Sequence, residues 1–153
     1  MNNLLNAMLH AVVYAFTAGA LLVAAYYVLD LITPGHLGKQ LRGGSDTGGD
    51  DAAAMPSQSA GVVSAAWMIS NALVLFTAIW TNGQTDLGTA LLWTVAFGAL
   101  GIALNIVMFL VVEALTPGRL REIVCTPGPV RPLAMLAAAA SLSVAGIVCA
   151  SIA

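Results

Sequence analysis

Four long apolar runs divide this chain and constrain its fold more than any other feature. They extend from Leu9 to Ile32, from Gly61 to Trp80, from Leu87 to Leu115 and from Leu133 to Ile152. Each meets the requirement of about 20 apolar residues for an α-helix that crosses a lipid bilayer. With 59% hydrophobic and 8% charged residues, the chain also lacks the polar surface of a water-soluble domain. The sequence therefore predicts an all-α membrane protein with four transmembrane helices.

A motif at the end of the first run returns at the end of the third. Asp30 to Leu37 reads Asp-Leu-Ile-Thr-Pro-Gly-His-Leu, and Glu113 to Leu120 reads Glu-Ala-Leu-Thr-Pro-Gly-Arg-Leu, 83 residues later. The likeness continues backwards at the same offset, for example from Leu21 to Leu104. We interpret the chain as a tandem duplication of a two-helix unit, with residues 1–82 as the first copy and residues 83–153 as the second.

The cationic residues predict how the helices are oriented in the membrane. All five lie in the connections after the first and third runs: Lys39, Arg42, Arg119, Arg121 and Arg131. The positive-inside rule puts these connections in the cytoplasm and both termini outside. Because each copy has two spans, both copies enter from the same side, which gives parallel repeats about an axis along the membrane normal. Many alternating-access carriers have inverted repeats instead.

The repeated Thr-Pro-Gly turn predicts where the first and third helices stop. Proline disfavours helical geometry in the residue before it, and Thr-Pro is also typical of an N-cap followed by the first residue of a new helix. On that interpretation Pro34 to Arg42 and Pro117 to Cys125 form short interfacial helices, with Leu37 and Leu120 facing lipid or protein. One long helix with a proline kink is the alternative. The turn residues are Thr33, Pro34, Gly35, Thr116, Pro117 and Gly118.

Asp30 and Glu113 lie at a helix C-terminus, where the helix dipole repels a carboxylate. Finding this placement in both copies suggests that the turn supplies hydrogen-bond donors. The two carboxylates are then structural caps, or ionisable groups that border a polar path, or interfacial groups exposed to water. Two amides, Asn71 and Asn105, lie well inside the second and third runs. They either join helices by hydrogen bonds or contribute to conduction.

The two connections differ in length, and several spans carry stripes of small residues. Residues 43–59 are rich in Gly, Ser and Asp and predict a flexible cytoplasmic loop, whereas residues 126–131 form a shorter, proline-rich connection. Small residues that recur every four positions let helices approach closely. These stripes favour a homo-oligomer and place the last span at a helix interface, either inside the bundle or between subunits. They comprise Ala7, Ala11, Ala15 and Gly19 in the first span and Ala137, Ser141, Ala145 and Cys149 in the last.

The chain has no motif that indicates an enzyme, a cofactor or a metal ion. It contains no phosphate-binding glycine loop, no His-Glu-x-x-His and no Gly-x-Ser-x-Gly sequence. His10 and His36 fall at opposite ends of one span, and no basic patch for nucleic acid is present. The only certain partner is the lipid bilayer.

The paired spans, each pair with its (Asp/Glu)-x-(Leu/Ile)-Thr-Pro-Gly turn, resemble domain-of-unknown-function family 350. The resemblance covers almost the whole chain. It implies a small bacterial inner-membrane protein built from two such units, without a settled activity. The second and fourth spans of that family often begin with Gly-Asn and alanines, whereas this chain has Ser59-Ala60-Gly61 and Arg131-Pro132-Leu133.

Two hypotheses for function follow. In the first, the protein is a structural or accessory membrane subunit that forms homo-oligomers and binds a cytoplasmic or membrane protein partner. In the second, it is a small oligomeric channel or transporter with a path bordered by Asp30 and Glu113. The small number of polar groups in the spans favours the first.

Overall fold

A computed structural model describes residues 2–33, 37–42, 56–82, 86–116, 120, 124 and 126–153. Its helices are α1 (Asn2–Ile32), α2 (Leu37–Arg42), α3 (Gln58–Asn82), α4 (Leu87–Leu115) and α6 (Pro132–Ile152). The helices α1, α3, α4 and α6 are long and apolar enough to cross a membrane, so the predicted all-α class and its four spans are confirmed. The first helix begins earlier than Leu9, and α3 begins inside the range 43–59 that was predicted as a loop. Residues 43–55 lie outside the described part of the chain.

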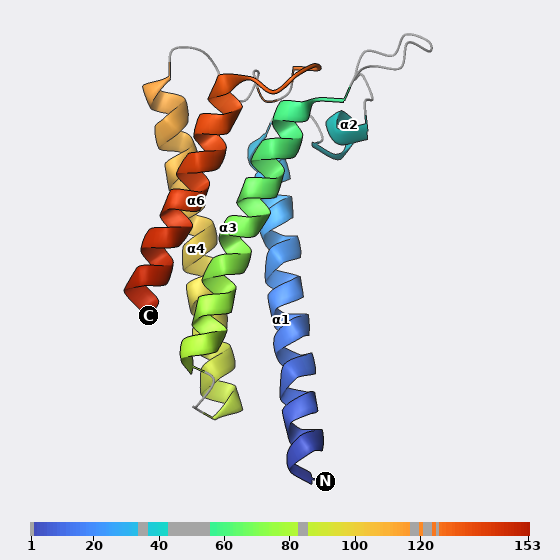
Figure 1. Ribbon diagram of the computed structural model, residues 1–153, viewed down its shortest axis with the longest axis vertical. Helices are drawn as coiled ribbons and strands as arrows, with labels where there is room; N and C mark the ends of the chain where they lie inside the picture. Colours follow the sequence, from blue (N-terminus) through green and yellow to red (C-terminus); the bar gives the residue numbers. More distant parts are fainter. Residues whose placement is uncertain are drawn as a thin grey trace.

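The four long helices run alternately up and down (Figure 1). α1 and α4 point one way, α3 and α6 the other, and both chain ends lie away from α2. We call the end that holds α2 and the start of α6 the α2 end. Any up-and-down bundle alternates in this way, so the alternation alone does not identify a duplication.

α3 is the central helix of the bundle. It packs most extensively against α6 and also contacts α4, α1 and α2. Within the most apolar stretch of each helix, 50% of α3 is buried inside the protein, against 11% of α1. The buried positions of α3 follow a spacing of four and three residues, which is the spacing of left-handed helix packing: Ala60, Ser64, Trp67, Asn71, Val74 and Ala78.

The last span lies at a helix interface inside the bundle, which is one of the two positions that its small residues predict. Its buried residues repeat the α3 spacing and are mostly small: Ala134, Ala138, Ser141, Ala145 and Val148. Small side chains let two helix backbones approach closely in a membrane, where no hydrophobic force drives helices together. This explains why α6 makes its largest interface with α3.

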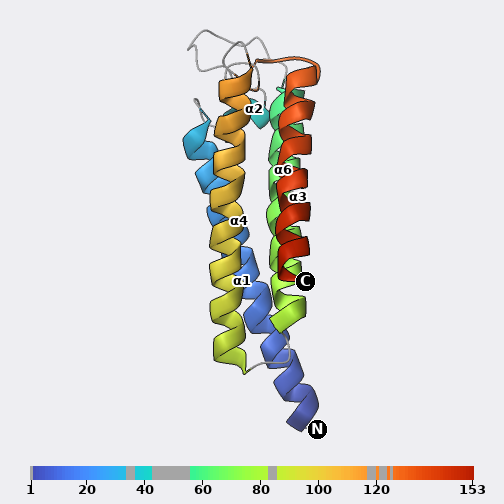
Figure 2. The same ribbon diagram turned by 90° about the vertical axis from the view of Figure 1, so that its left-hand side faces the viewer.

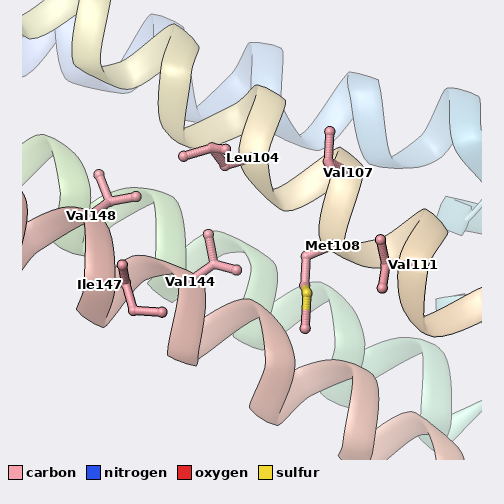
Figure 3. A pocket seen from close by; sticks show the side chains of 7 residues that line it. All are labelled: Leu104, Val107, Met108, Val111, Val144, Ile147 and Val148. Atoms are coloured by element: carbon pink, nitrogen blue, oxygen red, sulfur yellow. The ribbon is translucent and has the colours of Figure 1, made fainter.

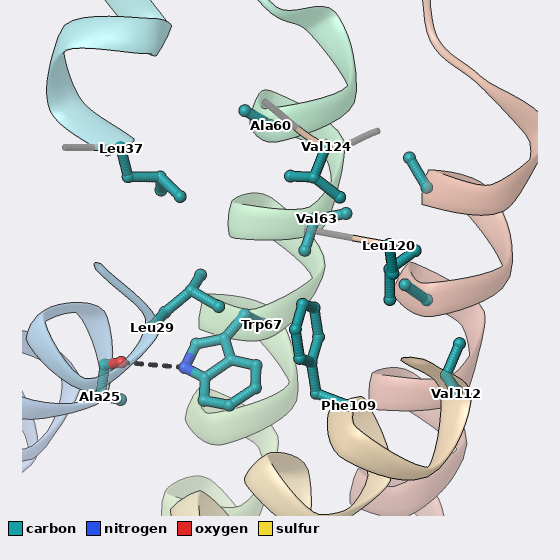
Figure 4. Close-up of a cluster of buried hydrophobic side chains, with 12 residues drawn as sticks. Ala25, Leu29, Leu37, Ala60, Val63, Trp67, Phe109, Val112, Leu120 and Val124 are labelled. Carbon is teal, nitrogen blue, oxygen red and sulfur yellow. Dashed lines mark hydrogen bonds between the residues drawn. The ribbon is translucent and has the colours of Figure 1, made fainter. Parts of the chain in front are cut away.

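The main apolar core lies toward the α2 end (Figure 4). Trp67 of α3 is fully buried there, beside Leu29 of α1 and Phe109 of α4. The indole nitrogen of Trp67 donates to the carbonyl oxygen of Ala25 at 3.0 Å, which joins α3 to α1. Leu37, the first residue of α2, is buried in the same core, so the start of the short helix faces protein.

The N-terminal end of α1 extends past the other helices (Figures 1 and 2). Its small-residue stripe, which we call the α1 stripe, is exposed: Ala7, Ala11, Ala15 and Gly19. The matching positions of α4, Ala90, Thr94 and Gly98, are buried. A Cβ atom on Gly98 would lie 2.8 Å from Cδ2 of Leu75, whereas one on Gly19 would meet nothing within 4 Å. The two similar helices therefore have different environments.

Candidate functional site

The threonines of the two motifs make the same kind of hydrogen bond. Oγ1 of Thr33 donates to the carbonyl oxygen of Leu29 at 2.9 Å, and Oγ1 of Thr116 donates to that of Val112 at 2.6 Å. Each hydroxyl thus satisfies a carbonyl at the end of the preceding helix. The amides that an N-cap hydroxyl would bind belong to residues outside the described chain, so the N-cap interpretation stays a prediction. Residues 34–36 and 117–119, which include Pro34, Gly35, Pro117 and Gly118, lie outside the described chain.

Asp30 joins the end of α1 to the start of α2. Its Oδ1 accepts a hydrogen bond from the backbone amide of Leu37 at 2.6 Å. The turn thus supplies a donor to this carboxylate, and two separate helices replace the single kinked helix in the first copy. A backbone amide at a helix start carries partial positive charge, so it offsets the unfavourable position of Asp30 on α1. Glu113 is half-buried at the matching position of α4.

The second predicted interfacial helix, over residues 117–125, lies mostly outside the described chain. Two of its residues are described, Leu120 and Val124, and both are helical and buried in the core. The connections after α2 and after α4 meet at the α2 end, in a group that we call the polar joint: Ser57, Ser59, Val124, Gly128 and Arg131.

Hydrogen bonds of the polar joint hold the starts of α3 and α6 together. Oγ of Ser57 donates to the carbonyl oxygen of Val124 at 2.7 Å and accepts from the amide of Ala60, which caps α3. Oγ of Ser59 accepts from the amide of Arg131 at 3.0 Å, one residue before Pro132 opens α6. The bonds from Ser57 to Val124 and from Ser59 to Arg131 connect residues 67 and 72 positions apart, and no local sequence signal predicts them.

A polar cluster joins three helices near the middle of the bundle. Nδ2 of Asn105 on α4 donates to Oγ of Ser70 on α3 at 2.9 Å, and that hydroxyl donates to the carbonyl oxygen of Ser141 on α6 at 2.8 Å. Asn105, Ser70 and Ser141 are all buried. Asn71, beside Ser70, donates from Nδ2 to the carbonyl oxygen of Trp67 in its own helix. Sequence analysis selected the two amides but missed Ser70, whose position one residue before Asn71 was the only signal.

The other predicted site residues that the structure describes do not lie together in one centre. Lys39 and Arg42 lie on α2, Arg131 caps α6 at the same end, and Arg119 and Arg121 lie outside the described chain. Among the described residues, no group of three or more His, Cys, Asp or Glu side chains could hold a metal ion.

A groove between α4 and α6 is lined only by apolar side chains (Figure 3). It has a volume of about 250 Å³. The lining residues are Leu104, Val107, Met108, Val111, Val144, Ile147 and Val148. A surface of this kind suits lipid chains and offers no ligand to an ion.

Asp86 caps α4 at the end of the bundle opposite α2. Its Oδ2 accepts a hydrogen bond from the backbone amide of Thr89 at 3.0 Å. This bond, which favours the charged carboxylate, holds the pKa of Asp86 below its usual value.

Comparisons with known proteins agree with this architecture. The chain is 29% identical over 152 residues to a UPF0719 transmembrane protein from Mycolicibacterium paratuberculosis, covering 99% of this chain and 92% of that protein. No solved structure matches the chain significantly. The sequence profile described as Domain of Unknown Function (DUF350) matches residues 3–152. This multi-pass membrane protein therefore belongs to the DUF350 family.

Proposed function

We propose that the protein is a structural or accessory subunit of the bacterial inner membrane, with both termini outside, and that it is not an enzyme. On this proposal it forms a homo-oligomer and binds a cytoplasmic or membrane protein partner. The observation that carries the proposal is the hydrogen bond between Asp30 and Leu37. This bond engages the carboxylate in holding α2 against the bundle, whereas an ion path needs the group to face the ion.

The polar groups inside the spans support the same proposal. Ser70 and Asn105 bind each other, and Ser70 also binds the main chain of α6. These bonds join three helices, so the polar groups in the middle of the bundle bind one another. The groove between α4 and α6 is apolar throughout (Figure 3). A channel formed by one chain would need a polar lining there.

The α1 stripe is the surface that we assign to a second copy of the chain. Ala15 and Gly19 lie in a shallow groove with Phe16 and Ala20. The matching stripe on α4 accepts the side chains of α3, where Leu75 packs against Gly98. A helix from another copy would find the same small residues on α1. The α2 end, which holds α2 with Lys39 and Arg42 in its sequence and Arg131 of the polar joint, is the surface that we assign to the partner.

Cysteine cross-linking in native membranes tests the assignment of the second copy. In a background with Cys125→Ser and Cys149→Ala, we expect Gly19→Cys and Ala15→Cys to give disulfide-linked dimers. Leu92→Cys is the matched control, because Leu92 is 70% exposed on α4 but outside the α1 stripe. Equal cross-linking of Leu92→Cys, or monomers only, would contradict the proposal.

A flux assay in proteoliposomes tests the alternative of a channel or transporter. We expect the wild type and the Asp30→Asn, Glu113→Gln double variant to show the same ion flux as empty vesicles. If the wild type conducts and the double variant does not, the two carboxylates border a path and the structural proposal is wrong.

A further inference from the structure

A second pocket lies at the end of the bundle opposite α2, where α3 and α6 end beside α4. It has a volume of about 410 Å³, which is within the usual range for pockets that bind small molecules. We call it the aromatic pocket. Rings, hydroxyls, an amide and one aliphatic side chain line it: Thr81, Asn82, Trp93, Phe97, Ser151 and Ile152. Its lining thus differs from that of the groove between α4 and α6, which is apolar.

The hydroxyl and amide groups of the aromatic pocket already use their own hydrogens. Oγ1 of Thr81 donates to the carbonyl oxygen of Thr77 at 2.9 Å, and Oγ of Ser151 donates to that of Val148 at 2.7 Å. Nδ2 of Asn82 donates to Oγ1 of Thr81 at 3.3 Å and to a carbonyl oxygen of α3 at 3.0 Å. A hydroxyl oxygen has two lone pairs, so Thr81 and Ser151 can each still accept a hydrogen bond. The pocket therefore suits a ligand that brings donors.

The rings and the charges at this end favour a cation. Trp93 and Phe97 are stacked, with ring centroids 5.6 Å apart, and Trp93 is 47% exposed. The face of a tryptophan ring attracts an ammonium group. No Lys or Arg occurs in residues 43–118 or after residue 131, and the carboxylate of Asp86 lies seven residues before Trp93, on the same side of α4. A positive charge together with hydrogen-bond donors describes a primary ammonium group.

The aromatic pocket continues into the groove between α4 and α6 (Figure 3). On α4, Phe97 of the pocket and Leu104 and Val111 of the groove are spaced by seven residues, so they share one face. On α6, Val148 of the groove lies one turn before Ile152 of the pocket. Phe97 and Ile152 also pack against the buried cluster that contains Val148. One seam therefore joins a polar, aromatic end to an apolar stretch, which is the pattern of an amphiphile.

The length of the seam suits one chain of a lipid. At about 1.5 Å per residue, Phe97 and Leu104 are about 10 Å apart along α4, and the hydrocarbon of one leaflet is about 15 Å deep. A lipid with its headgroup in the aromatic pocket would thus place an acyl chain against Leu104 and Val107.

We propose that the aromatic pocket and the groove together bind one phospholipid whose headgroup ends in a primary ammonium group, as in phosphatidylethanolamine. The ammonium lies against the face of Trp93 and donates to hydroxyl oxygens of the pocket, while an acyl chain fills the groove. The trimethylated headgroup of phosphatidylcholine carries the same charge but has no N–H to donate, so it binds less tightly.

Native mass spectrometry of the full chain in detergent tests the headgroup. Phosphatidylethanolamine and phosphatidylcholine with identical acyl chains are added in equal amounts, and we expect a several-fold preference for the first. Trp93→Ala should abolish this preference, and Trp93→Phe should keep part of it. Trp80→Ala is the matched control, because Trp80 is stacked on Phe76 in a similar way but does not line the aromatic pocket. Equal binding of both lipids by the wild type, or an equal loss in Trp80→Ala, would overturn the proposal.

Two further measurements test whether the ligand is a lipid. Val107→Trp places a ring in the groove at a position that is 55% exposed, so binding of both phospholipids should fall while the fold is kept. Unchanged lipid binding with a loss of dimers would mean that a second copy covers the groove, which would overturn the proposal. An excess of free ethanolamine, which has the ammonium but no acyl chain, should not displace bound phosphatidylethanolamine. Displacement would mean that a free amine is the ligand, which would also overturn it.

Discussion

The indole nitrogen of Trp67 donates to the carbonyl oxygen of Ala25 across 3.0 Å, within an otherwise apolar core (Figure 4). This bond holds α1 against α3 near the α2 end. Only the C-terminal part of α1 is well packed, around Ala25 and Leu29. The attachment of α1 to the bundle therefore depends on a small number of contacts.

Replacing Trp67 by phenylalanine should destabilise the bundle. The ring still fills much of the core, but the donor to Ala25 is lost, and we expect a loss of about 1 kcal/mol in unfolding free energy. Denaturation in mixed detergent micelles, followed by circular dichroism, measures this loss. Trp80→Phe is the control, since Trp80 is 78% exposed. Equal losses for both variants would show that the hydrogen bond contributes nothing.

The packing of Gly98 predicts a second effect on stability. In Gly98→Val the added atoms would collide with Leu75 and Leu21, whose methyl carbons lie 2.8 and 3.0 Å from the Cβ position. We expect a loss of about 1–3 kcal/mol, the usual range for an overpacked core. Gly146→Val is the matched control on α6, because nothing lies within 4 Å of its Cβ position. The same unfolding measurement should separate the two variants, and identical midpoints would refute the predicted clash.

Asp30 variants test whether the carboxylate holds α2. Asp30→Asn keeps an oxygen that can accept from the Leu37 amide, so we expect a small loss of stability. Asp30→Ala leaves that amide without its partner and should cost about 1–3 kcal/mol. Limited proteolysis at the α2 end should also be faster in Asp30→Ala than in Asp30→Asn. Equal behaviour of the two variants would mean that the hydrogen bond does not hold α2.

Asp86 predicts a pH dependence of stability. Because the amide of Thr89 holds the folded pKa of Asp86 below its usual value of about 3.9, the unfolded chain binds a proton more readily. The stabilisation is therefore complete above the usual pKa and is lost as the pH falls through the folded pKa. Melting temperatures measured from pH 7 to pH 2 should fall more steeply for the wild type than for Asp86→Asn, which caps the helix without titrating. If the melting temperatures of the two proteins fell equally with pH, Asp86 would contribute nothing to the pH dependence of stability.

Reporter fusions test the proposed orientation. Alkaline phosphatase fused to either terminus should be active and green fluorescent protein dark, whereas in residues 43–55 green fluorescent protein should fluoresce and the phosphatase should be inactive. The physical reason is the position of all five cationic residues in the connections at the α2 end. Alkaline phosphatase and green fluorescent protein give opposite readouts on the two sides. Active phosphatase in residues 43–55 would show that the orientation is opposite to the proposed one.

The sequence predicted the spans well because the bilayer imposes length and apolarity on each helix separately. It also predicted that α1 ends or kinks at the first Thr-Pro-Gly turn and that small residues place α6 at an interface. It did not predict the direction of the Thr33 hydroxyl, since a threonine before proline can cap either neighbouring helix. The bond between Ser59 and Arg131 depends on how distant segments meet, which periodicity does not reveal.

The likeness of α1 and α4 in sequence hid one difference between them. α1 and α4 have similar sequences, so analysis of each helix alone predicts similar packing. α4 nevertheless buries Ala90, Thr94 and Gly98, whereas α1 leaves its stripe exposed. The difference arises because side chains of α3, such as Leu75, pack against α4 along that stretch, whereas none of the described residues lies within 4 Å of the Cβ position of Gly19 on α1. The two-unit interpretation stays a prediction.

The sparse packing of α1 has a consequence for assembly. α3, α4 and α6 bury their own faces against one another, while α1 adds few contacts and lies at the edge. A bundle of this kind can accept its first helix from a neighbouring molecule without changing any other interface. Exchange of α1 between chains would convert an intramolecular contact into an intermolecular one, so a polypeptide that starts at residue 56 should recruit α1 when the two fragments are produced together.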